Sequence, residues 1–548
     1  MKTKKAMKKI THISMAALVA MGMLGTSCNK AESPEIETPE TQKENIVTLT
    51  TSVGFAVDGT KALAIDYTAK TLTKTFAEGE TMVLRYKNTK DDWVKAVSAP
   101  LTAGDITNGG KSATVTFTLT NPDKTKNVDY IYPAAIVNQS GNMNEAALFE
   151  SQDGTLNTIA STFDYSRKIG AWDGDNLPSL TLENQLAILA ITLKNADGSS
   201  DITSSITGLT LSDGTKTYNV TREAVAGPIY VAIFPTADAT ITVTATDGSK
   251  NYTKTLTSKT YAKGQFYQQG LKMAEIISLS GRYSSDDELV IADGCILTGY
   301  GYNYSCKVSI ADGATVTLRD VENNGDIAGC PGIKCLGDAT IILEGDNTVT
   351  GGDQYAGIYV PGDKTLTIRG TGSLNVTGGS RAAGIGGNAT GDANCGSIVI
   401  SGGTVTATGS FGGAGIGLGA NGGECKAITI SGGTVEATGG SGGAGIGLGA
   451  NGEGCKAITI SGGTVTAKGD DQAPGIGGAT GYYESITITG DVTKVTATRG
   501  SGAQYSIGIE DVDSWDYCGP ITIGGTVYFE EGNFTNDDLK TSQFVYQP

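Results

Sequence analysis

Histidine is almost missing from this chain of 548 residues, which contains only His12. Residues 1–27 have the layout of an export signal, so the mature chain would contain no imidazole at all. Without histidine, Ser-His-Asp and Cys-His nucleophilic sites are excluded, and so are histidine-ligated metals. This absence removes the commonest hydrolase and metalloenzyme sites. We predict that the chain is not an enzyme and needs no cofactor.

Cysteine is absent from residues 29–294, whereas eight of the nine cysteines lie between Cys295 and Cys518. Glycine also concentrates in the second half of the chain. Because cysteine and glycine usage both change along the chain, the sequence predicts two different architectures that are joined near residue 276.

Positive charge is in deficit, since 40 Lys and Arg stand against 57 Asp and Glu and give a formal net charge of −17. Residues 1–27 hold five of the lysines and no acidic residue, so their removal changes the net charge to −22. An acidic surface of this size repels phosphate backbones. We therefore expect no nucleic-acid partner.

The N-terminus combines a basic head, an apolar run and a small-residue motif that ends in cysteine. Five lysines precede the apolar run Ile10–Leu24, and Gly25-Thr26-Ser27-Cys28 follows it. The run is about 15 residues, shorter than the roughly 20 of a transmembrane helix, which favours a cleaved signal over residues 1–27. We predict that Cys28 is lipidated and anchors the protein in the outer membrane at the cell surface. The alternative is an ordinary signal peptide with a chance cysteine.

Residues 28–45 are acidic, contain proline and predict a flexible linker. Residues 46–275 then alternate apolar and polar side chains with period two, in runs rich in Thr and Val. Asp-Gly, Asn-Gly and Pro turns separate these runs, a pattern typical of antiparallel sheets. We predict two antiparallel β-sandwiches, over residues 46–140 and 141–275.

Two groups of motifs in this half keep a recognisable order and spacing. In chain order they are Phe76-x-x-Gly79-Glu80, Arg85-Tyr86, Trp93, Asp129-Tyr130-x-Tyr132-Pro133, the segment that begins at Gly227, Lys263-Gly264-Gln265-Phe266-Tyr267 and Met273. Over residues 46–275 the chain resembles the two domains of the fimbrillin family of type V pili. The resemblance implies a lipoprotein precursor that is exported, then anchored or polymerised at the outer surface.

The resemblance also implies assembly by strand addition, in which an extended strand of one subunit completes the sheet of another. In polymerising members an N-terminal strand is removed after a basic residue. Lys61 lies where such a cut would fall, with Lys in place of the usual Arg. The donated strand comes from the C-terminus in those members, but here a second architecture follows Met273. We therefore predict a terminal subunit (tip or accessory) with other pilus subunits as partners, or an unpolymerised relative.

The second half contains an internal repeat with a period of 30 residues. Three copies begin at Cys395, Cys425 and Cys455, and degenerate copies lie on both sides. Each copy has three short strand-like pieces between Gly-rich corners, with apolar residues at i and i+2 such as Ile398 and Ile400. Three strands per unit predict the coil of a parallel β-helix, whereas a propeller blade needs about four.

The predicted fold class is therefore all-β, with tandem antiparallel, fimbrillin-like β-sandwich domains followed by a right-handed parallel β-helix over residues 276–548. We expect about eight or nine coils of about 30 residues each, stacked about 4.8 Å apart. Such stacking predicts ladders of equal residues, for example Asn421 over Asn451. Gly402-Gly403 would lie at a corner that requires positive φ.

The three repeated cysteines predict a ladder of thiols. Two neighbouring thiols at this spacing are able to form a disulfide, but three have no complete pairing among themselves, so we favour buried free thiols at Cys395, Cys425 and Cys455. We predict no zinc site at Cys330 and Cys335. Their spacing lacks a close pair of thiols, and no histidine completes the ligand set.

Some parallel β-helices cleave polysaccharides with clustered carboxylates, or with Lys and Arg beside a calcium site. Residues 395–469 contain few ionisable side chains. Lys426 and Lys456 share one rung and Glu424 faces Gly454, so no acid–base pair repeats. A polysaccharide lyase is the least favoured of the functions considered.

Carbohydrate binding is better supported, because exposed aromatic rings stack on the C–H faces of sugars. The candidate residues are Tyr300, Tyr302, Tyr304, Trp515 and Tyr517. Closely spaced carboxylates form a weak calcium candidate at Asp511, Asp513 and Asp516. The alternatives are packing of the three tyrosines over the first coil and a solvated acidic turn.

The coil motifs Gly-Thr-Val-Thr-Ala and Gly-Ala-Gly-Ile-Gly resemble, over roughly residues 330–530, a surface β-helix family of anaerobic bacteria. Some members of that family bind pectic or cellulosic carbohydrate, which implies surface or host glycans as partners. Two hypotheses follow. The first is an adhesin or pilus tip or accessory subunit that displays its β-helix, and the second is a carbohydrate-binding surface lipoprotein unrelated to pili.

Overall fold

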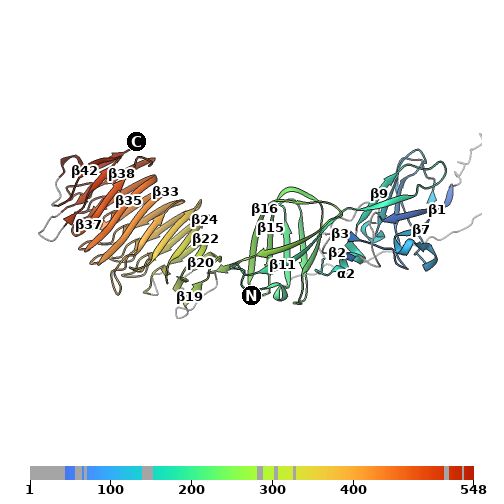
Figure 1. Ribbon diagram of the computed structural model, residues 1–548, viewed down its shortest axis with the longest axis horizontal. Helices are drawn as coiled ribbons and strands as arrows, with labels where there is room; N and C mark the ends of the chain where they lie inside the picture. Colours follow the sequence, from blue (N-terminus) through green and yellow to red (C-terminus); the bar gives the residue numbers. More distant parts are fainter. Residues whose placement is uncertain are drawn as a thin grey trace, which may run out of the picture. The chain divides into compact units, whose positions relative to one another are not determined.

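The computed structural model describes residues 44–55, 64–66, 71–138, 152–163, 165–280, 288–301, 307–324, 329–510, 517–532 and 536–548. Over these residues the chain is all-β (Figure 1). Its short helical segments are η1 (Ala103–Asp105), η2 (Asn108–Gly110), η3 (Ala134–Ile136), α2 (Leu156–Thr158), η4 (Ile159–Phe163), η5 (Thr203–Ser205) and η7 (Asp537–Leu539). None of the described helices is long and apolar enough to span a bilayer.

The N-terminal part of the chain forms an eight-stranded sheet in the order β5-β4-β8-β9-β10-β1-β7-β6. All neighbours pair antiparallel except β1 and β10, which pair parallel. A separate pair joins β2 (Ala64–Asp66) to β3 (Thr71–Thr73). The strands of the large sheet are β1 (Ile46–Phe55), β4 (Val83–Lys87), β5 (Trp93–Val97), β6 (Ile106–Thr107), β7 (Ser112–Thr120), β8 (Val128–Tyr132), β9 (Ser166–Gly170) and β10 (Leu180–Asn184).

Strand β7 shows why these sequences form strands with one buried face. Its residues alternate, so that Val115, Phe117 and Leu119 are at most 1% exposed while the threonines between them face outward. Period-two alternation places successive side chains on opposite faces of a strand. Buried side chains from most of these strands form one apolar cluster, which also contains Tyr86 and Tyr130.

The first sheet extends beyond residue 140, where the boundary between the two sandwiches was predicted. Strands β9 and β10 follow that position in the sequence, yet they lie between β8 and β1. They enter the sheet through long-range pairing, Tyr132 with Ser166 and Val53 with Leu180. Period-two patterning identifies a strand but does not say which sheet it joins.

The following residues form two sheets that share one apolar cluster. Three strands pair in the order β14-β11-β17, and β12, β13, β15 and β16 pair antiparallel in a second sheet. These strands are β11 (Ala187–Lys194), β12 (Gly208–Ser212), β13 (Thr217–Thr221), β14 (Ile229–Ile233), β15 (Thr236–Thr246), β16 (Asn251–Tyr261) and β17 (Phe266–Lys272).

Strand β18 (Ala274–Ser278) links an antiparallel sheet to a run of parallel strands. This strand pairs antiparallel with β16 and parallel with β20 (Ile296–Gly301). The change therefore falls beside residue 276, where the sequence predicted that the two architectures join.

Beyond β18 the strands stack in parallel as coils (Figure 1). One ladder of nine strands consists of β19 (Glu288–Ile291), β21 (Lys307–Ile310), β23 (Ile333–Cys335), β26 (Ile358–Tyr359), β29 (Ile385–Gly386), β32 (Ile416–Gly417), β34 (Ile446–Gly447), β36 (Ile476–Gly478) and β39 (Ile507–Ile509). The other coil strands are β22 (Ala314–Asn324), β24 (Ala339–Glu344), β25 (Asp346–Thr350), β27 (Thr365–Gly370), β28 (Ser373–Thr377), β30 (Ser397–Ile400), β31 (Thr404–Thr408), β33 (Glu424–Ser441), β35 (Gly454–Asp470), β37 (Tyr482–Ile488), β38 (Lys494–Thr498), β40 (Tyr517–Cys518) and β41 (Ile521–Ile523).

The stacking register confirms the repeat predicted from the sequence. Ile398 pairs with Ile428, and Ile428 pairs with Ile458 in the next coil. All three side chains are fully buried, because residues at i and i+2 of each coil strand point into the interior. The predicted Asn ladder is also present, with Asn451 Nδ2 donating to Asn421 Oδ1 at 3.2 Å.

Glycine is required at two kinds of position in the coils. Gly403 has φ +81° at a corner, whereas its neighbour Gly402 does not have positive φ, so only one residue of the predicted pair needs that conformation. A second ladder, not predicted, has φ near +130° at Gly386, Gly417, Gly447, Gly477 and Gly508. L-residues rarely adopt this conformation, and a Cβ at Gly417 would lie 1.9 Å from the Gly447 carbonyl oxygen.

The chain ends by pairing with the last coils. Strand β41 forms an antiparallel pair with β42 (Thr526–Phe529), and β43 (Gln543–Tyr546) pairs antiparallel with β38. The ring of Phe544 contacts Tyr528 edge to face at 6.0 Å. The C-terminal strand is therefore part of the β-helical half.

Candidate functional site

The predicted site residues fall into two groups. Tyr300 and Tyr517 belong to the described residues and are 53% and 42% exposed. The others lie outside the described residues: Cys28, Lys61, Tyr302, Tyr304, Trp515, Asp511, Asp513 and Asp516. Lipidation, processing and calcium binding therefore stay predictions. Within the described part of the chain, no three His, Cys, Asp or Glu side chains are placed to hold a metal ion.

Tyr300 lies near the end of β20, far from Tyr517 in the order of coils. Its amide donates to Ser280 Oγ at 3.2 Å, and it pairs with Glu322 of β22. Because about half of its side-chain surface is exposed, the ring reaches solvent at this end of the β-helix. The structure does not bring Tyr300 and Tyr517 into one site, since they lie in strands at opposite ends of the coil ladder.

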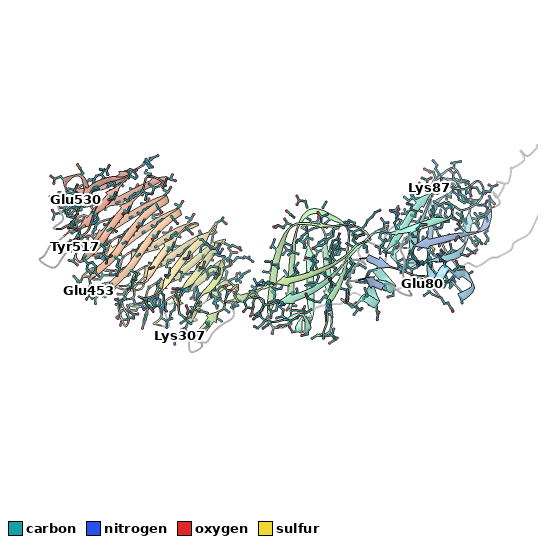
Figure 2. All side chains as sticks on the ribbon, in the orientation of Figure 1. Glu80, Lys87, Lys307, Glu453, Tyr517 and Glu530 are labelled. Carbon is teal, nitrogen blue, oxygen red and sulfur yellow. The ribbon has the colours of Figure 1, made fainter. Side chains whose placement is uncertain are left out.

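Tyr517, which is labelled in Figure 2, belongs to a rung of aromatic and acidic residues that the sequence interpretation missed. It pairs with Tyr482, which pairs with Gly454 in the coil before. The Tyr482 ring covers Gly454, and its hydroxyl donates to Glu424 Oε1 at 2.7 Å. This hydrogen bond, with burial as the second cause, raises the pKa of Tyr482 to about 12. Tyr517 likewise donates to Glu531 Oε2 at 3.0 Å.

A groove of about 410 Å³ crosses three successive coils, those of β23, β26 and β29. A volume of this size is within the range of about 300–1,000 Å³ typical of small-molecule sites. The side chains that give the groove its chemistry are Lys334, Tyr355, Tyr359, Pro361, Asn388 and Asp392. None of them was among the residues predicted from the sequence. They lie in the degenerate copies, whose register is not evident without the stacked coils.

Tyr359 lies at the bottom of this groove and is 6% exposed. Its hydroxyl donates to Asp392 Oδ2 at 2.9 Å, while Asp392 Oδ1 accepts from the Asn394 amide at 3.2 Å. Burial, and next the hydrogen bond to Asp392, raises the pKa of Tyr359 well above its ordinary value. The hydroxyl therefore remains a donor, and both oxygens of Asp392 are engaged.

Asn388 and Lys334 complete the groove from the neighbouring coils. Asn388 is 4% exposed, and its Oδ1 accepts from the Ala356 amide at 2.9 Å, which ties the loops of two coils together. Lys334 pairs with Tyr359 along the rung, and Tyr359 pairs with Gly386. Because the same rung holds only glycine from Gly386 to Gly508, projecting side chains at this position are confined to the earlier coils.

A second candidate site is the position that β1 occupies between β7 and β10 in the N-terminal sheet, called the β1 seat below. Thr51 Oγ1 donates to the Pro178 carbonyl at 3.0 Å, and Tyr130 donates to the same oxygen at 3.1 Å. At the end of the strand, the Phe55 ring stacks on Phe76 with centroids 4.3 Å apart. A cavity of about 860 Å³ adjoins Phe76.

Three tyrosines among the motif residues behind the fimbrillin resemblance lie in the interior of this sheet, whereas Trp93 is 46% exposed. Tyr86, Tyr130 and Tyr132 are at most 2% exposed. Asp129 is 1% exposed and accepts two hydrogen bonds from Arg167, at 2.7 and 2.8 Å. These contacts pack and orient strands β4, β8 and β9 of the sheet.

The three repeated thiols are free and buried, as the thiol-ladder prediction requires. Cys395 pairs with Cys425, and Cys425 pairs with Cys455. The hydrogen bond from a neighbouring thiol, together with burial, raises the pKa of Cys425 and of Cys455 well above the ordinary value of 9.0. Tyr483 pairs with Cys455 and extends the buried rung to Cys518.

We expect these thiols to resist modification in the native protein. At pH 8 a disulfide reagent should label Cys425 and Cys455 only after denaturation, as mapped by mass spectrometry of peptides. The raised pKa values also predict a pH dependence of the free energy of unfolding. The contribution of these thiols is fully present below about pH 9 and is lost above it, because the unfolded chain ionises its thiols first. If the folded protein were labelled as fast as a solvent-exposed thiol, the thiols would not form a buried ladder.

The comparisons with known proteins support the β-helical half. A family model described as a beta helix repeat matches residues 398–420, 428–450 and 458–482. The β-helix repeat is therefore confirmed. These segments run from β30 to the start of β37, the most regular coils. No curated protein sequence matches the chain significantly.

Solved structures give weaker likenesses. A presumed cell adhesion protein from Bacteroides fragilis is 13% identical, with a TM-score of 0.24, over 40% of this chain and 93% of its own. A fimbrial assembly protein from Parabacteroides distasonis is 12% identical, with a TM-score of 0.23, over 42% of this chain and 93% of its own. Scores of this size carry no argument about the fold or function of this chain.

Proposed function

We propose that the protein is a lipid-anchored surface protein of the outer membrane that acts as an adhesin or as a tip or accessory subunit of a pilus. In this proposal the fimbrillin-like half, two antiparallel β-sandwiches, anchors the protein or assembles it by strand addition. The right-handed parallel β-helix is displayed for binding, and the proposal includes no catalysis and no cofactor. The observation that carries it is the position of β1 within the N-terminal sheet.

In this proposal, strand β1 is the strand that is removed and replaced. It pairs with β7 from Ile46 to Gly54, but with β10 only from Val53 to Phe55. Loss of β1 would remove the partner strand from one edge of β7 and one edge of β10. It would also expose the apolar side chains that β1 now covers. An extended strand fills such a gap with main-chain hydrogen bonds and alternate side chains. Lys61, the proposed cleavage point, follows β1 closely in the sequence.

The C-terminal strand supports a terminal position in an assembly. Because β43 pairs with β38 and its Phe544 packs on Tyr528, donation of this strand would disrupt the end of the β-helical half. A subunit that accepts a strand at the β1 seat and donates none ends a polymer. This is the physical reason for proposing a tip or accessory subunit and not a repeating subunit.

The alternative, a carbohydrate-binding surface lipoprotein unrelated to pili, is favoured by a different observation. The groove over Tyr355 and Tyr359 combines aromatic and hydrogen-bonding side chains, as saccharide sites do. The two functions differ in what they require of β1. Only the pilus function needs β1 to be exchangeable.

A chain that begins at Ala62 is expected to bind one peptide of residues 46–55 and to remain monomeric. Sedimentation with labelled peptide measures both properties. A matched control appends residues 46–55 after Pro548, which supplies a donor strand, and we expect concentration-dependent polymers from it. Polymers of the unextended chain would exclude a terminal position. Failure of the peptide to bind would leave the carbohydrate-binding lipoprotein as the function.

A further inference from the structure

We infer that the N-terminal sheet docks on a phospholipid surface through the end that carries Trp93, so that the protein contacts the bilayer with its own side chains as well as with its anchor. The inference rests on the proposed lipid anchoring and goes beyond it, because it assigns the end of the sheet that faces the membrane. It is independent of strand addition and of the groove in the coils.

Four segments of the chain meet at this end of the sheet. Lys87, the last residue of β4, pairs with Trp93, the first residue of β5. The Asp123 amide donates to the Lys87 carbonyl at 2.8 Å, which joins the β4–β5 turn to the residues that follow β7. Thr120, the last residue of β7, pairs with Ile46, the first residue of β1. Ile46, Lys87 and Trp93 therefore lie at one end, called the tether end below.

The tether end is the part of the sheet that is connected to the proposed anchor. Residues 28–45 join Cys28 to Ile46, and a segment of this length spans at most about 60 Å. A lipid on Cys28 would hold the tether end within that distance of the bilayer. Tethering raises the effective concentration of the lipid surface at this end, so even a weak contact would be populated.

Two large apolar side chains are exposed at the tether end, Ile46 at 59% and Trp93 at 46%. The Arg85 guanidinium carbon lies 4.8 Å from the centroid of the Trp93 ring, and Lys87 Nζ lies 5.1 Å from it. Both cations are close enough to hold the ring in place. Tryptophan is enriched where a bilayer meets water, and long Lys and Arg side chains beside it reach the lipid phosphates.

Charge at the tether end does not oppose this contact. The chain has a net charge of −17, but residues 87–93 and 121–126 together contain four lysines and three aspartates. Glu44 balances the remaining positive charge, and Arg85 pairs with Asp129 at 3.5 Å. The tether end is therefore close to neutral and approaches a zwitterionic lipid surface without net repulsion. Apolar contact then favours binding.

Flotation with vesicles of phosphatidylcholine and phosphatidylethanolamine tests the inference. The mature chain is used with Cys28→Ala, so that it carries no lipid and binds only through its surface. We expect it to float with the vesicles and Trp93→Ala to lower its partition coefficient about tenfold. Phe411→Ala is the matched control and should change nothing, because Phe411 is even more exposed, 64%, but lies in the coils. Thermal unfolding checks that each variant is folded.

Fluorescence quenching shows which part of the chain contacts the lipid. With Trp172 and Trp515 both changed to Phe, Trp93 is the one tryptophan left, and brominated acyl chains should quench its emission. The inference is overturned if the C28A chain does not float at millimolar lipid, if F411A lowers partitioning as much as W93A, or if flotation occurs without quenching. Self-association that W93A abolishes, in a chain that does not float, would assign the surface to a second copy and would also overturn it.

The proposed function is tested separately from this contact. The mass of the N-terminal peptide shows whether Cys28 carries a lipid, and flotation of the C28A chain does not depend on that result. Uptake of the peptide of residues 46–55 by a W93A chain that begins at Ala62 reports on strand addition alone. An unlipidated Cys28 together with flotation of the C28A chain would remove the anchor and leave the docking surface.

Discussion

A chain that begins at Ala62, and so lacks β1, is expected to unfold in its N-terminal sheet at least about 10 °C below the intact mature chain. Val53 is 1% exposed in this sheet, and Leu49 and Phe55 are partly buried against the same apolar cluster. Burying such side chains stabilises by roughly 1.5–3 kcal/mol each, so their loss costs on the order of 5 kcal/mol. The main-chain hydrogen bonds to β7 are lost as well.

Hydrogen exchange locates this effect, because the amides of β7 and β10 should lose protection while those of the coils keep it. Added peptide of residues 46–55 should restore both protection and unfolding temperature. The same peptide with Val53→Asp is the control and should restore neither, since it would bury a carboxylate. An unchanged unfolding temperature in the chain without β1 would contradict a structural role for this strand and would remove the basis of the assembly proposal.

Gly417→Ala is expected to destabilise the β-helical half by roughly 3–6 kcal/mol. Two effects add at this position. The backbone has φ +136°, which an L-residue adopts only with strain, and the new Cβ would lie 1.9 Å from the Gly447 carbonyl oxygen. This carbonyl belongs to the next coil, so relief of the clash requires the two coils to separate.

Gly525→Ala separates the two effects. Gly525 also has positive φ, +84°, but a Cβ there would meet nothing within 4 Å. Strain alone should then cost about 1–2 kcal/mol. Denaturant unfolding of the full chain, followed by the signal of the coils, measures both variants. If G417A costs no more than G525A, close stacking of the glycine ladder does not control the stability of the coils.

The sequence predicted the coils well because a solenoid repeats its contacts at a fixed interval. The 30-residue period by itself placed Cys425 over Cys455 and Asn421 over Asn451, and both pairs are present. Period two also identified strands such as β7. Both patterns are local, or are repeated at constant spacing, so they can be read along the chain.

The position of β9 and β10 illustrates what local patterns do not contain. Their alternation marks them as strands, but their place between β8 and β1 depends on long-range pairing, of Ser166 with Tyr132 and of Leu180 with Val53. Any strand with a suitable apolar face satisfies the same pattern. The choice of partner is made by the packing of the whole sheet.

The sequence predicted the aromatic surfaces of the β-helix only in part. Tyr517 was predicted as an exposed ring, whereas its neighbour Tyr482 and the groove of Lys334, Tyr355 and Tyr359 were not predicted. The groove residues come from coils of unequal length, so their side chains meet only once the coils are stacked.

The sequence alone determined that this is an all-β protein with a coil repeat and almost no histidine. Composition and periodicity are properties of the chain itself, and they decide which elements form. Only the tertiary structure decided that β1 lies between β7 and β10 and that Lys334 stands beside Tyr359 on one rung. The physical reason is that both arrangements are made by contacts between segments whose separation follows no fixed interval.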